Sequence, residues 1–345
     1  MQTEAAILVA TGQPLVLATL DIPELKPGQV LVDLAYSGAC GTQVAEWRGR
    51  KGEDRWLPHC LGHEGSGTVR ETGAGVSKVK PGDRVVLSWL KGSGIEAGGA
   101  RYRWGEQTVN AGGVTTFQRH AVVSENRLTP LPAGLAMDVA ILLGCAAPTG
   151  MGAVFNVAGV RAGDAVAVFG TGGIGLNACM GAAFAGATPV IGIDPSPERR
   201  MLASRFGATV TIDPGAGDVG AAIRALVPAG VDVAIEATGL PEVMALALAV
   251  TRSQGGRAVV IGNARHGTML SLDPGLFNQG KSLLGTWGGD SVPDRDNGRF
   301  TRLLTSSRFD PRGLLSAPYP LAAVNRALED LEAGRVGRPL IDMAA

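Results

Sequence analysis

The sequence predicts an α/β protein in which a Rossmann domain, a doubly wound parallel sheet covered by helices, is combined with a second, mostly β domain. Three observations support this prediction. The chain has 345 residues, which is long for one compact core. Apolar strands and helical stretches alternate strictly between residues 147 and 286, as in parallel sheets covered on both faces. The regions before and after contain mainly short strands and turns, or isolated helices.

The first region, residues 1–146, opens with short strands. Turn signals such as glycine, proline and polar residues separate them. The expected strands are residues 5–10, 15–20, 29–37, 65–73, 83–89 and 117–124. Such a series without intervening helices favours a mostly β domain.

The middle region, residues 147–286, has a different rhythm. Its expected strands are residues 164–170, 189–194, 209–213, 231–237 and 256–262. Its expected helices are residues 176–187, 196–208, 219–227 and 241–254. A helix between each pair of strands predicts right-handed crossovers and a parallel sheet.

The tail, residues 287–345, adds two amphipathic helices, expected at 298–307 and 321–334, and a short strand at 338–343. Composition divides the chain in the same way, because four of the five tryptophans precede residue 147 and Trp287 follows the alternation. We therefore expect residues 147–286 to form one domain, and residues 1–146 and 287–345 to fold together as another.

Bulk properties exclude several classes of function. Lysine plus arginine and aspartate plus glutamate both number 31, so no net charge attracts nucleic acid or an anionic membrane. No apolar run approaches the ~20 residues of a membrane span. The start, MQTEAAILVA, has an acid where a secretory signal carries bases, so we expect a cytoplasmic protein. Four irregularly spaced cysteines predict free thiols or metal ligands, with no disulfide framework.

A glycine loop follows the first strand of the middle region. Gly170, Gly172 and Gly175 form a GxGxxG pattern, with Gly173 and Ile174 inside it, at the start of a helix. These glycines permit a tight turn, close approach to a pyrophosphate and close helix–strand packing. A lone GxGxxG is weak evidence, but this position, directly between a strand and a helix, predicts dinucleotide binding.

The end of the second Rossmann strand indicates which dinucleotide is bound. Asp194 follows Gly175 by 19 residues, where a carboxylate accepts hydrogen bonds from the adenosine ribose. That carboxylate would repel a 2′-phosphate, so NAD is favoured over NADP. Arg199 and Arg200 lie nearby and reduce this preference, and Arg199 is a candidate cofactor contact.

The stretch HCLGHEGSG, residues 59–67, raises the question of a metal site. Cys60 and His63 could form a local C-x-x-H pair. Alternatively, His63 acts with distant cysteines, and Cys60 is a small buried residue. Spacing alone does not decide between these two interpretations, and the absence of any metal is a third possibility. A catalytic zinc needs three protein ligands and an open fourth position.

Several motifs together resemble the zinc-dependent medium-chain alcohol dehydrogenase family over nearly the whole chain: SGACGT, GHEGSGTV, KPGDRVV, LLGCAAPTGMGAV and GTGGIG. The resemblance implies a GroES-like catalytic domain and one catalytic zinc held by Cys40, His63 and Cys145. It places Glu64 beside the metal, and Cys60 matches no ligand position.

The resemblance also implies how such a site works. Two thiolates and a neutral imidazole leave zinc acidic enough to lower the pKa of a bound alcohol, from which hydride passes to the nicotinamide. Thr42 matches the hydroxyl that carries the proton away. Thr149 matches a nicotinamide-side contact, Arg338 a basic residue that reaches the pyrophosphate, and Trp89 a substrate-pocket aromatic. Members are usually homodimers or homotetramers.

The chain departs from the family at three places. No cysteine lies between Trp89 and Thr116, so the usual four-cysteine structural zinc is excluded. The charged and aromatic residues of this segment could contact a polar or anionic substrate, but we expect a solvated loop face, because Glu96 and Glu106 offset much of the charge. They are Lys91, Arg101, Tyr102, Arg103 and Trp104. Gln43 stands where an aspartate is common, which alters the outer shell of the metal. Ala45 replaces a relay histidine, which leaves Glu46, water or the cofactor hydroxyls for proton exit.

The predicted function is hydride transfer between NAD and a small secondary alcohol, polyol or cyclitol and its ketone, at a catalytic zinc. One alternative keeps the fold without metal, as an NAD(P)H-dependent quinone- or enoyl-type reductase. The joint presence of Cys40, His63 and Cys145 speaks against it. A further alternative is a dinucleotide-binding protein without turnover, and Thr42 and Glu64 speak against that.

Overall fold

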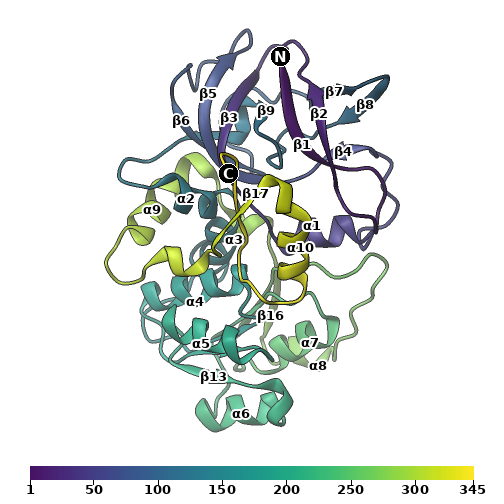
Figure 1. Ribbon diagram of the computed structural model, residues 1–345. Coiled ribbons are helices and arrows are strands. Elements are labelled where there is room, and N and C mark those ends of the chain that lie inside the picture. Colours follow the sequence, from purple (N-terminus) through teal and green to yellow (C-terminus); the bar gives the residue numbers. More distant parts are fainter. The chain divides into compact units, whose positions relative to one another are not determined.

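The computed structural model describes residues 1–345, and its elements are labelled in Figure 1. The chain forms two compact units, one of Met1–Cys145 with Val292–Ala345 and one of Ala146–Ser291. The boundaries lie one residue before and five residues after the expected ones. The second shift arises because the short helix η5 (Gly288–Asp290) belongs to the Rossmann unit. There the Ser291 hydroxyl donates to the Pro148 carbonyl at 2.8 Å.

The first unit contains a closed five-stranded barrel with the strand order β1-β2-β7-β8-β4. Its strands are β1 (Gln2–Leu8), β2 (Val16–Asp21), β7 (Arg101–Trp104), β8 (Gln107–Asn110) and β4 (His59–Cys60). Barrel closure removes the free sheet edges that would otherwise expose unpaired backbone groups.

A seven-stranded sheet completes the β part of this unit, in the order β10-β6-β5-β3-β18-β17, with β9 also paired to β3. Its strands are β10 (Leu128–Pro130), β6 (Arg84–Ser88), β5 (Glu64–Thr72), β3 (Gln29–Gly38), β18 (Leu340–Asp342), β17 (Pro318–Pro320) and β9 (His120–Ser124). The C-terminal tail, yellow in Figure 1, returns to this sheet because β18 pairs with β3.

Helices of the first unit flank these sheets. They are α1 (Gly41–Trp47), η1 (Glu125–Arg127), α2 (Met137–Ala140), η2 (Ile141–Gly144), α9 (Pro293–Leu304), η6 (Pro311–Leu314), η7 (Leu321–Ala323) and α10 (Val324–Glu332). Trp47 on α1, Leu328 on α10 and the inward side chains of β3 and β6 belong to one apolar core. Burial of such side chains is the main force that fixes α1 against the sheet.

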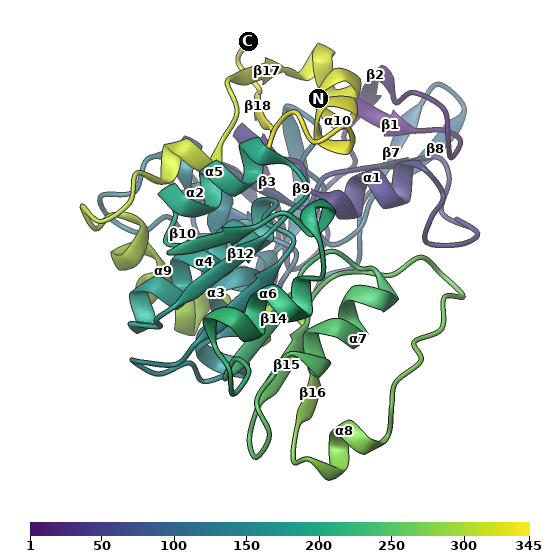
Figure 2. The ribbon, with the colours of Figure 1, turned by 90° about the horizontal axis from the view of Figure 1, so that it is seen from below.

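The second unit is a six-stranded parallel sheet in the order β13-β12-β11-β14-β15-β16, seen in Figure 2. Its strands are β13 (Val210–Ile212), β12 (Val190–Ile193), β11 (Val166–Phe169), β14 (Val233–Glu236), β15 (Arg257–Val260) and β16 (Ser282–Gly285). The order reverses between β11 and β14, which is the dinucleotide-binding topology with its ligand crevice at that point. The predicted Rossmann fold is confirmed.

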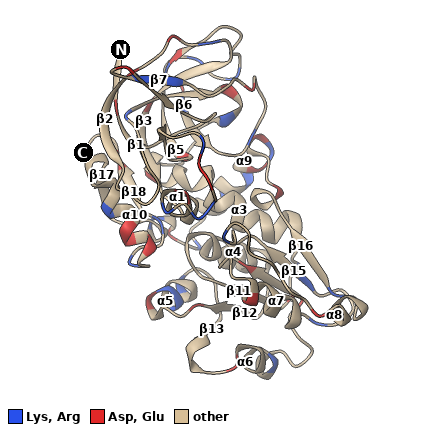
Figure 3. Cartoon of the chain, turned by 90° about the vertical axis from the view of Figure 1, so that its right-hand side faces the viewer, with Lys and Arg blue, Asp and Glu red and all other residues tan.

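The helices of the Rossmann unit surround this sheet. They are α3 (Ala146–Gly152), η3 (Ala153–Val157), α4 (Gly173–Ala185), α5 (Pro197–Arg205), η4 (Pro214–Ala216), α6 (Val219–Leu226), α7 (Pro241–Ala249) and α8 (Gly275–Asn278). Helix α5 is largely blue in Figure 3, because its sequence PERRMLASR contains three arginines.

Two regions differ from the sequence-based expectation. Residues 137–157 are mostly helical, but no helix was predicted there. The segment is apolar almost throughout, so it lacks the alternation of apolar and polar residues that indicates a helix. The segment after Trp89 was expected to be a solvated loop face, but β7 and β8 form a hairpin of the barrel. Arg101 and Arg103 are exposed as expected, whereas Tyr102 is only 1% exposed because alternate residues of a strand face opposite sides.

No single helix of the chain is long and apolar enough to cross a membrane. One bent pair of consecutive helices, Met137–Gly144 and Ala146–Val157, could do so by length and composition alone.

Candidate functional site

Cys40 lies at the start of α1, directly after β3. Its backbone is extended (φ −130°, ψ 172°), and its sulfur accepts a hydrogen bond from the Thr42 N–H at 3.4 Å. The Gln43 side chain accepts from the Cys40 N–H at 2.9 Å, which completes a capping box. A reciprocal cap of this kind satisfies free N–H groups at the helix start and fixes the direction of the cysteine sulfur.

His63 and Glu64 lie where β5 begins. The register of β3 against β5 pairs Ser37 with Gly65, so the segments that carry Cys40 and His63 run side by side. Two glycines make room for Glu64. A Cβ atom at Gly38 would lie 2.8 Å from the Glu64 carboxyl carbon, and one at Gly144 would lie 2.7 Å from its Cβ. Close backbone approach therefore requires glycine at both positions.

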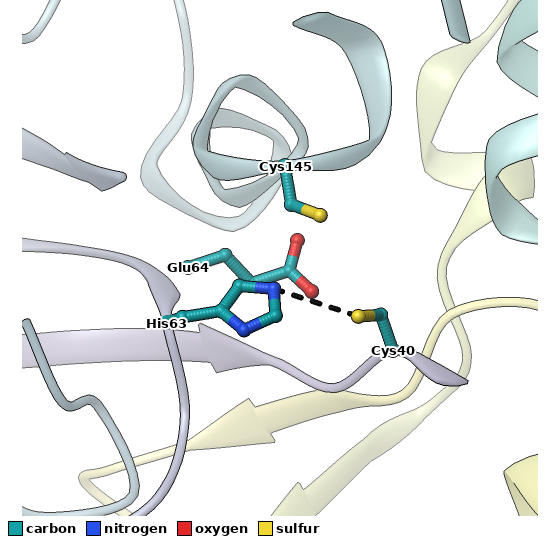
Figure 4. A group of neighbouring side chains, drawn as sticks. All are labelled: Cys40, His63, Glu64 and Cys145. Carbon is teal, nitrogen blue, oxygen red and sulfur yellow. Dashed lines mark hydrogen bonds between the residues drawn. The ribbon is translucent and has the colours of Figure 1, made fainter. Parts of the chain in front are cut away.

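Four side chains of the first unit converge, as Figure 4 shows: Cys40, His63, Glu64 and Cys145. One donor atom from each lies within 4.8 Å of the others. The Cys40 sulfur and His63 Nε2 are 3.5 Å apart. Cys40, Glu64 and Cys145 are buried, and His63 is half-buried. The three predicted ligands and the predicted auxiliary acid therefore lie close together. His63 lies beside the sequence-distant Cys40 and Cys145, and it does not form a local pair with Cys60.

The charges of this cluster are coupled. A hydrogen bond between the two sulfurs, aided by His63 and Arg338, holds the pKa of Cys40 well below its usual value. The same bond and burial raise the pKa of Cys145. Burial alone would lower the pKa of His63, but the adjacent Cys40 thiolate outweighs it and raises that pKa. Burial raises the pKa of Glu64 despite the opposing charge of Arg338.

This donor set fits zinc. Sulfur and nitrogen ligands at the usual distances from a tetrahedral zinc lie about 3.6 Å apart, close to the 3.5 Å between the Cys40 sulfur and His63 Nε2. Two thiols, one imidazole and a buried carboxylate are the ligand types that zinc prefers. Cys60 is outside the group. It is 3% exposed in a separate apolar cluster, and burial raises its pKa to about 12, so it is packing, as expected.

Glu64 is held by a second buried charge. The Arg338 Nη1 donates to Glu64 Oε1 at 2.5 Å, and the two side chains are 2% and 0% exposed. Glu64 Oε2 and Arg338 Nε have no hydrogen-bond partner. Such a pair is costly to bury and costlier to break. The predicted contact of Arg338 with a pyrophosphate remains a prediction, because the structure shows only its pairing with Glu64 and with the Ala39 carbonyl.

Two other predicted site residues lie near this cluster. The Trp89 ring packs edge-to-face near His63, with ring centroids 6.4 Å apart. Thr42 is half-buried in the first turn of α1, two residues from Cys40. Their predicted roles in substrate binding and proton transfer remain predictions.

The glycine loop of the second unit joins β11 to α4. Gly170 has φ +82°, and a Cβ atom at Gly175 would lie 1.8 Å from the Gly170 carbonyl oxygen. No side chain could fit at Gly175. The space around Gly172, by contrast, is open within 4 Å, and no side chain caps the start of α4. A helix N-terminus with free N–H groups next to open space fits a phosphate.

Asp194 directly follows β12, at the edge of the sheet where the glycine loop follows β11. It is 2% exposed, and its two oxygens accept from the N–H groups of Thr171 and Ser196, each at 2.9 Å. Arg199 Nη1 is 3.9 Å from this carboxylate. The buried hydroxyls of Thr149 and Thr171 have no partner in the protein. Unpaired buried polar atoms within this unit fit a bound ligand.

Glu236 at the end of β14 was not predicted from the sequence as a functional residue. Glu236 is fully buried, and its Oε1 accepts from the N–H groups of Thr238 and Gly239 at 2.6 and 2.9 Å. It fixes the turn that follows β14, and its Oε2 has no partner. The sequence does show an acid at the end of an apolar strand. A buried carboxylate at such a position is unfavourable unless it accepts hydrogen bonds, here from the N–H groups of the following turn.

A second group of potential ligands lies in the first unit and was also missed: Glu46, Asp54 and His59. His59 Nε2 is 2.9 Å from an Asp54 oxygen, and Lys51 pairs with Glu46 at 2.9 Å. Each potential ligand of this group already has a partner within the protein, so we assign no metal to it.

Comparison with known proteins gives consistent matches over the chain. The family description "Alcohol dehydrogenase GroES-like domain" matches residues 26–133, and "Zinc-binding dehydrogenase" matches residues 173–305. Geraniol dehydrogenase of Castellaniella defragrans is 33% identical over 99% of this chain and 98% of its own.

Two crystal structures are similar over 99% of both chains. One is an alcohol dehydrogenase zinc-binding domain protein from Burkholderia ambifaria (TM-score 0.91, 30% identity). The other is benzyl alcohol dehydrogenase from Acinetobacter calcoaceticus (TM-score 0.90, 27% identity).

Proposed function

The chain belongs to the zinc-type medium-chain alcohol dehydrogenase family, and from this premise we propose that it is a zinc- and NAD-dependent alcohol dehydrogenase. The family prediction made from the sequence motifs is thereby confirmed, and oxidoreductase activity on an alcohol follows from it. The metal, the nucleotide and the substrate belong to the proposal.

The observation that carries the proposal is the four-donor cluster. Cys40, His63 and Cys145 would hold one zinc per chain, with Glu64 beside it. When bound, zinc supplies a Lewis acid that lowers the pKa of an alcohol and polarises a carbonyl. A metal-free reductase of this fold would not need two buried thiols and an imidazole with their donor atoms within 4.8 Å of one another.

The other residues have roles around that centre. Arg338 pairs with Glu64, so the carboxylate would not add an unpaired negative charge beside the two thiolates. The Thr42 hydroxyl would accept the proton of the alcohol. Because residue 45 is alanine, no imidazole continues this path, and the proton would leave through Glu46, water or the cofactor hydroxyls. The indole of Trp89 would exclude water from the His63 side of the site.

The nucleotide would bind to the Rossmann unit. The loop Gly170–Gly175 and the start of α4 would hold the pyrophosphate, and Asp194 the adenosine ribose. Thr149 and Arg199 are the further proposed contacts. When bound, NAD supplies the hydride acceptor. The buried carboxylate of Asp194 would repel a 2′-phosphate and so favours NAD over NADP, although Arg199 lies 3.9 Å from it and reduces this preference.

The substrate within the alcohol class is a narrower proposal. Secondary alcohols, polyols and cyclitols are expected from the sequence, whereas two similar proteins are named for the primary alcohols geraniol and benzyl alcohol. A panel with NAD and NADP should therefore contain both kinds. We also propose a homodimer or homotetramer, as is usual in this family.

The deciding experiment is the zinc content of the purified protein, measured by elemental analysis without added metal. We expect about one zinc per chain, lost in Cys145→Ala and kept in the control Cys60→Ala, which removes a buried thiol outside the cluster. A value near zero that added zinc does not restore would refute the metal and redirect the search to metal-free reductase substrates.

A further inference from the structure

Gln43 connects two metal ligands. Its side chain is 1% exposed, and it contacts both the Cys40 backbone and the His63 ring. Oε1 accepts from the Cys40 N–H at 2.9 Å, and Nε2 faces His63 Nδ1. Outer groups of this kind set the tautomer and the orientation of a metal-bound histidine.

The direction of the Gln43 amide follows from its partners. The oxygen and nitrogen of an amide usually have to be assigned from the hydrogen bonds they make. Here one partner is a backbone N–H, which only donates, so the amide oxygen must face Cys40. The NH₂ group therefore faces His63 Nδ1 and donates to it.

This arrangement places the ring hydrogen of His63. A neutral imidazole has one donor and one acceptor nitrogen. If Nδ1 accepts from Gln43, the hydrogen is on Nε2, which points at the Cys40 sulfur at 3.5 Å. Zinc bound at Nε2 needs the opposite tautomer, with the hydrogen on Nδ1 and an acceptor next to it.

A glutamine cannot serve both donors well. With the hydrogen on Nδ1, the single amide oxygen would have to serve both Cys40 and His63, and the buried NH₂ would lose its acceptor. A carboxylate would offer one oxygen to each donor. A buried donor without a partner is unfavourable, so the amide acts against the zinc-binding tautomer.

We propose that Gln43 is a positioning residue that stabilises the zinc-free tautomer of His63 and so makes the metal of this site easier to release. The inference rests on the proposed function in one respect, namely that zinc is the metal. It predicts the direction of an effect: replacing the amide should tighten zinc binding, whereas a group that merely supported the ligand would loosen it when removed.

The test compares two variants with the wild type by competition with a chromophoric chelator for Zn²⁺. Gln43→Glu keeps the length and the capping box and supplies the second oxygen. We expect its zinc dissociation constant to fall by about 10- to 100-fold, the range of outer-shell effects on metal affinity. Gln43→Met removes the NH₂ donor without adding charge, and we expect a lower zinc dissociation constant than in the wild type. Zinc affinity equal to or weaker than that of the wild type in both variants would overturn the proposal.

The second readout is the ¹⁵N spectrum of labelled histidine in the zinc-free wild type. The other three histidines, His59, His120 and His266, serve as internal references. We expect Nδ1 of His63 to carry no hydrogen in the zinc-free protein and to carry one with Zn²⁺ bound. A hydrogen on Nδ1 before zinc is added would overturn the assignment. If no zinc binds at all, the proposed function fails, but this spectrum still tests the role of Gln43.

Discussion

We predict that hydrogen bonds to Glu125 hold in place the segment in which many members of the family carry a second, structural zinc. It is fully buried at the start of η1. Its Oε1 accepts from the N–H groups of Ser77 and Lys78 at 2.7 and 2.8 Å, and its Oε2 accepts from the Ile95 N–H at 2.6 Å. Ile95 lies in the segment where the structural zinc lobe is absent, so this carboxylate ties that segment to the sheet.

The magnitude follows from the three bonds. A hydrogen bond to a charged group contributes about 1.5–3 kcal/mol to stability. Glu125→Gln keeps an oxygen for two N–H groups but turns its NH₂ toward the Ile95 N–H, so we expect a loss of about 2–3 kcal/mol. Glu125→Ala removes all three bonds, and because such bonds are not additive we expect about 4–5 kcal/mol, a large share of the ~5–15 kcal/mol of a typical domain.

The effect depends on pH in a defined direction. Burial alone would raise the pKa of Glu125, but the three N–H bonds outweigh it and hold the pKa below the usual value. A lowered pKa means that the stabilisation is complete above the unfolded value of ~4.3 and is lost as the pH falls through the folded pKa. The difference between the wild type and Glu125→Gln should therefore be constant near neutral pH and shrink in acid.

The assay is urea unfolding followed by tryptophan fluorescence, which reports mainly on the first unit because four of the five tryptophans lie in it. Hydrogen exchange of peptides over residues 91–99 gives the local effect. The matched control is Glu106→Gln, an exposed acid of the same segment, which should change nothing. If Glu125→Gln shifts the unfolding free energy by less than 0.5 kcal/mol and leaves exchange unchanged, the reasoning is wrong.

Three further predictions concern other parts of the chain. Gly175→Ala should reduce NADH affinity at least tenfold in a fluorescence titration, because the added Cβ has no space. Gly172→Ala should leave the fold of the unit unchanged in circular dichroism, because the space around Gly172 is open. Asp194→Asn should weaken NADH binding and narrow its advantage over NADPH, and equal weakening for both nucleotides would contradict the proposed ribose contact. Tyr102→Phe should destabilise the first unit by about 1–3 kcal/mol in urea unfolding, because its hydroxyl accepts from the buried Val122 N–H at 2.7 Å, and an unchanged midpoint would refute this.

The sequence by itself determined the Rossmann unit. Strand–helix alternation and the glycine loop are local patterns, each contained within a few residues to a few tens of residues. They can be read from the sequence because backbone hydrogen bonds and side-chain periodicity are also set by residues close in the chain. For the same reason the sequence was a poor guide to β7 and β8. Their side-chain directions depend on barrel partners, so Tyr102 became core while the flanking arginines stayed exposed.

The four-donor cluster was decided by tertiary structure. Motifs suggested Cys40, His63 and Cys145 through resemblance, but spacing alone could not separate Cys145 from Cys60. The register of β3 against β5 brings Cys40 beside His63. The Glu64–Arg338 pair joins residues 274 positions apart, and only the return of the tail to the sheet creates it. Local propensity carries no information about such distances, because they are set by which strands pair and by what the core excludes.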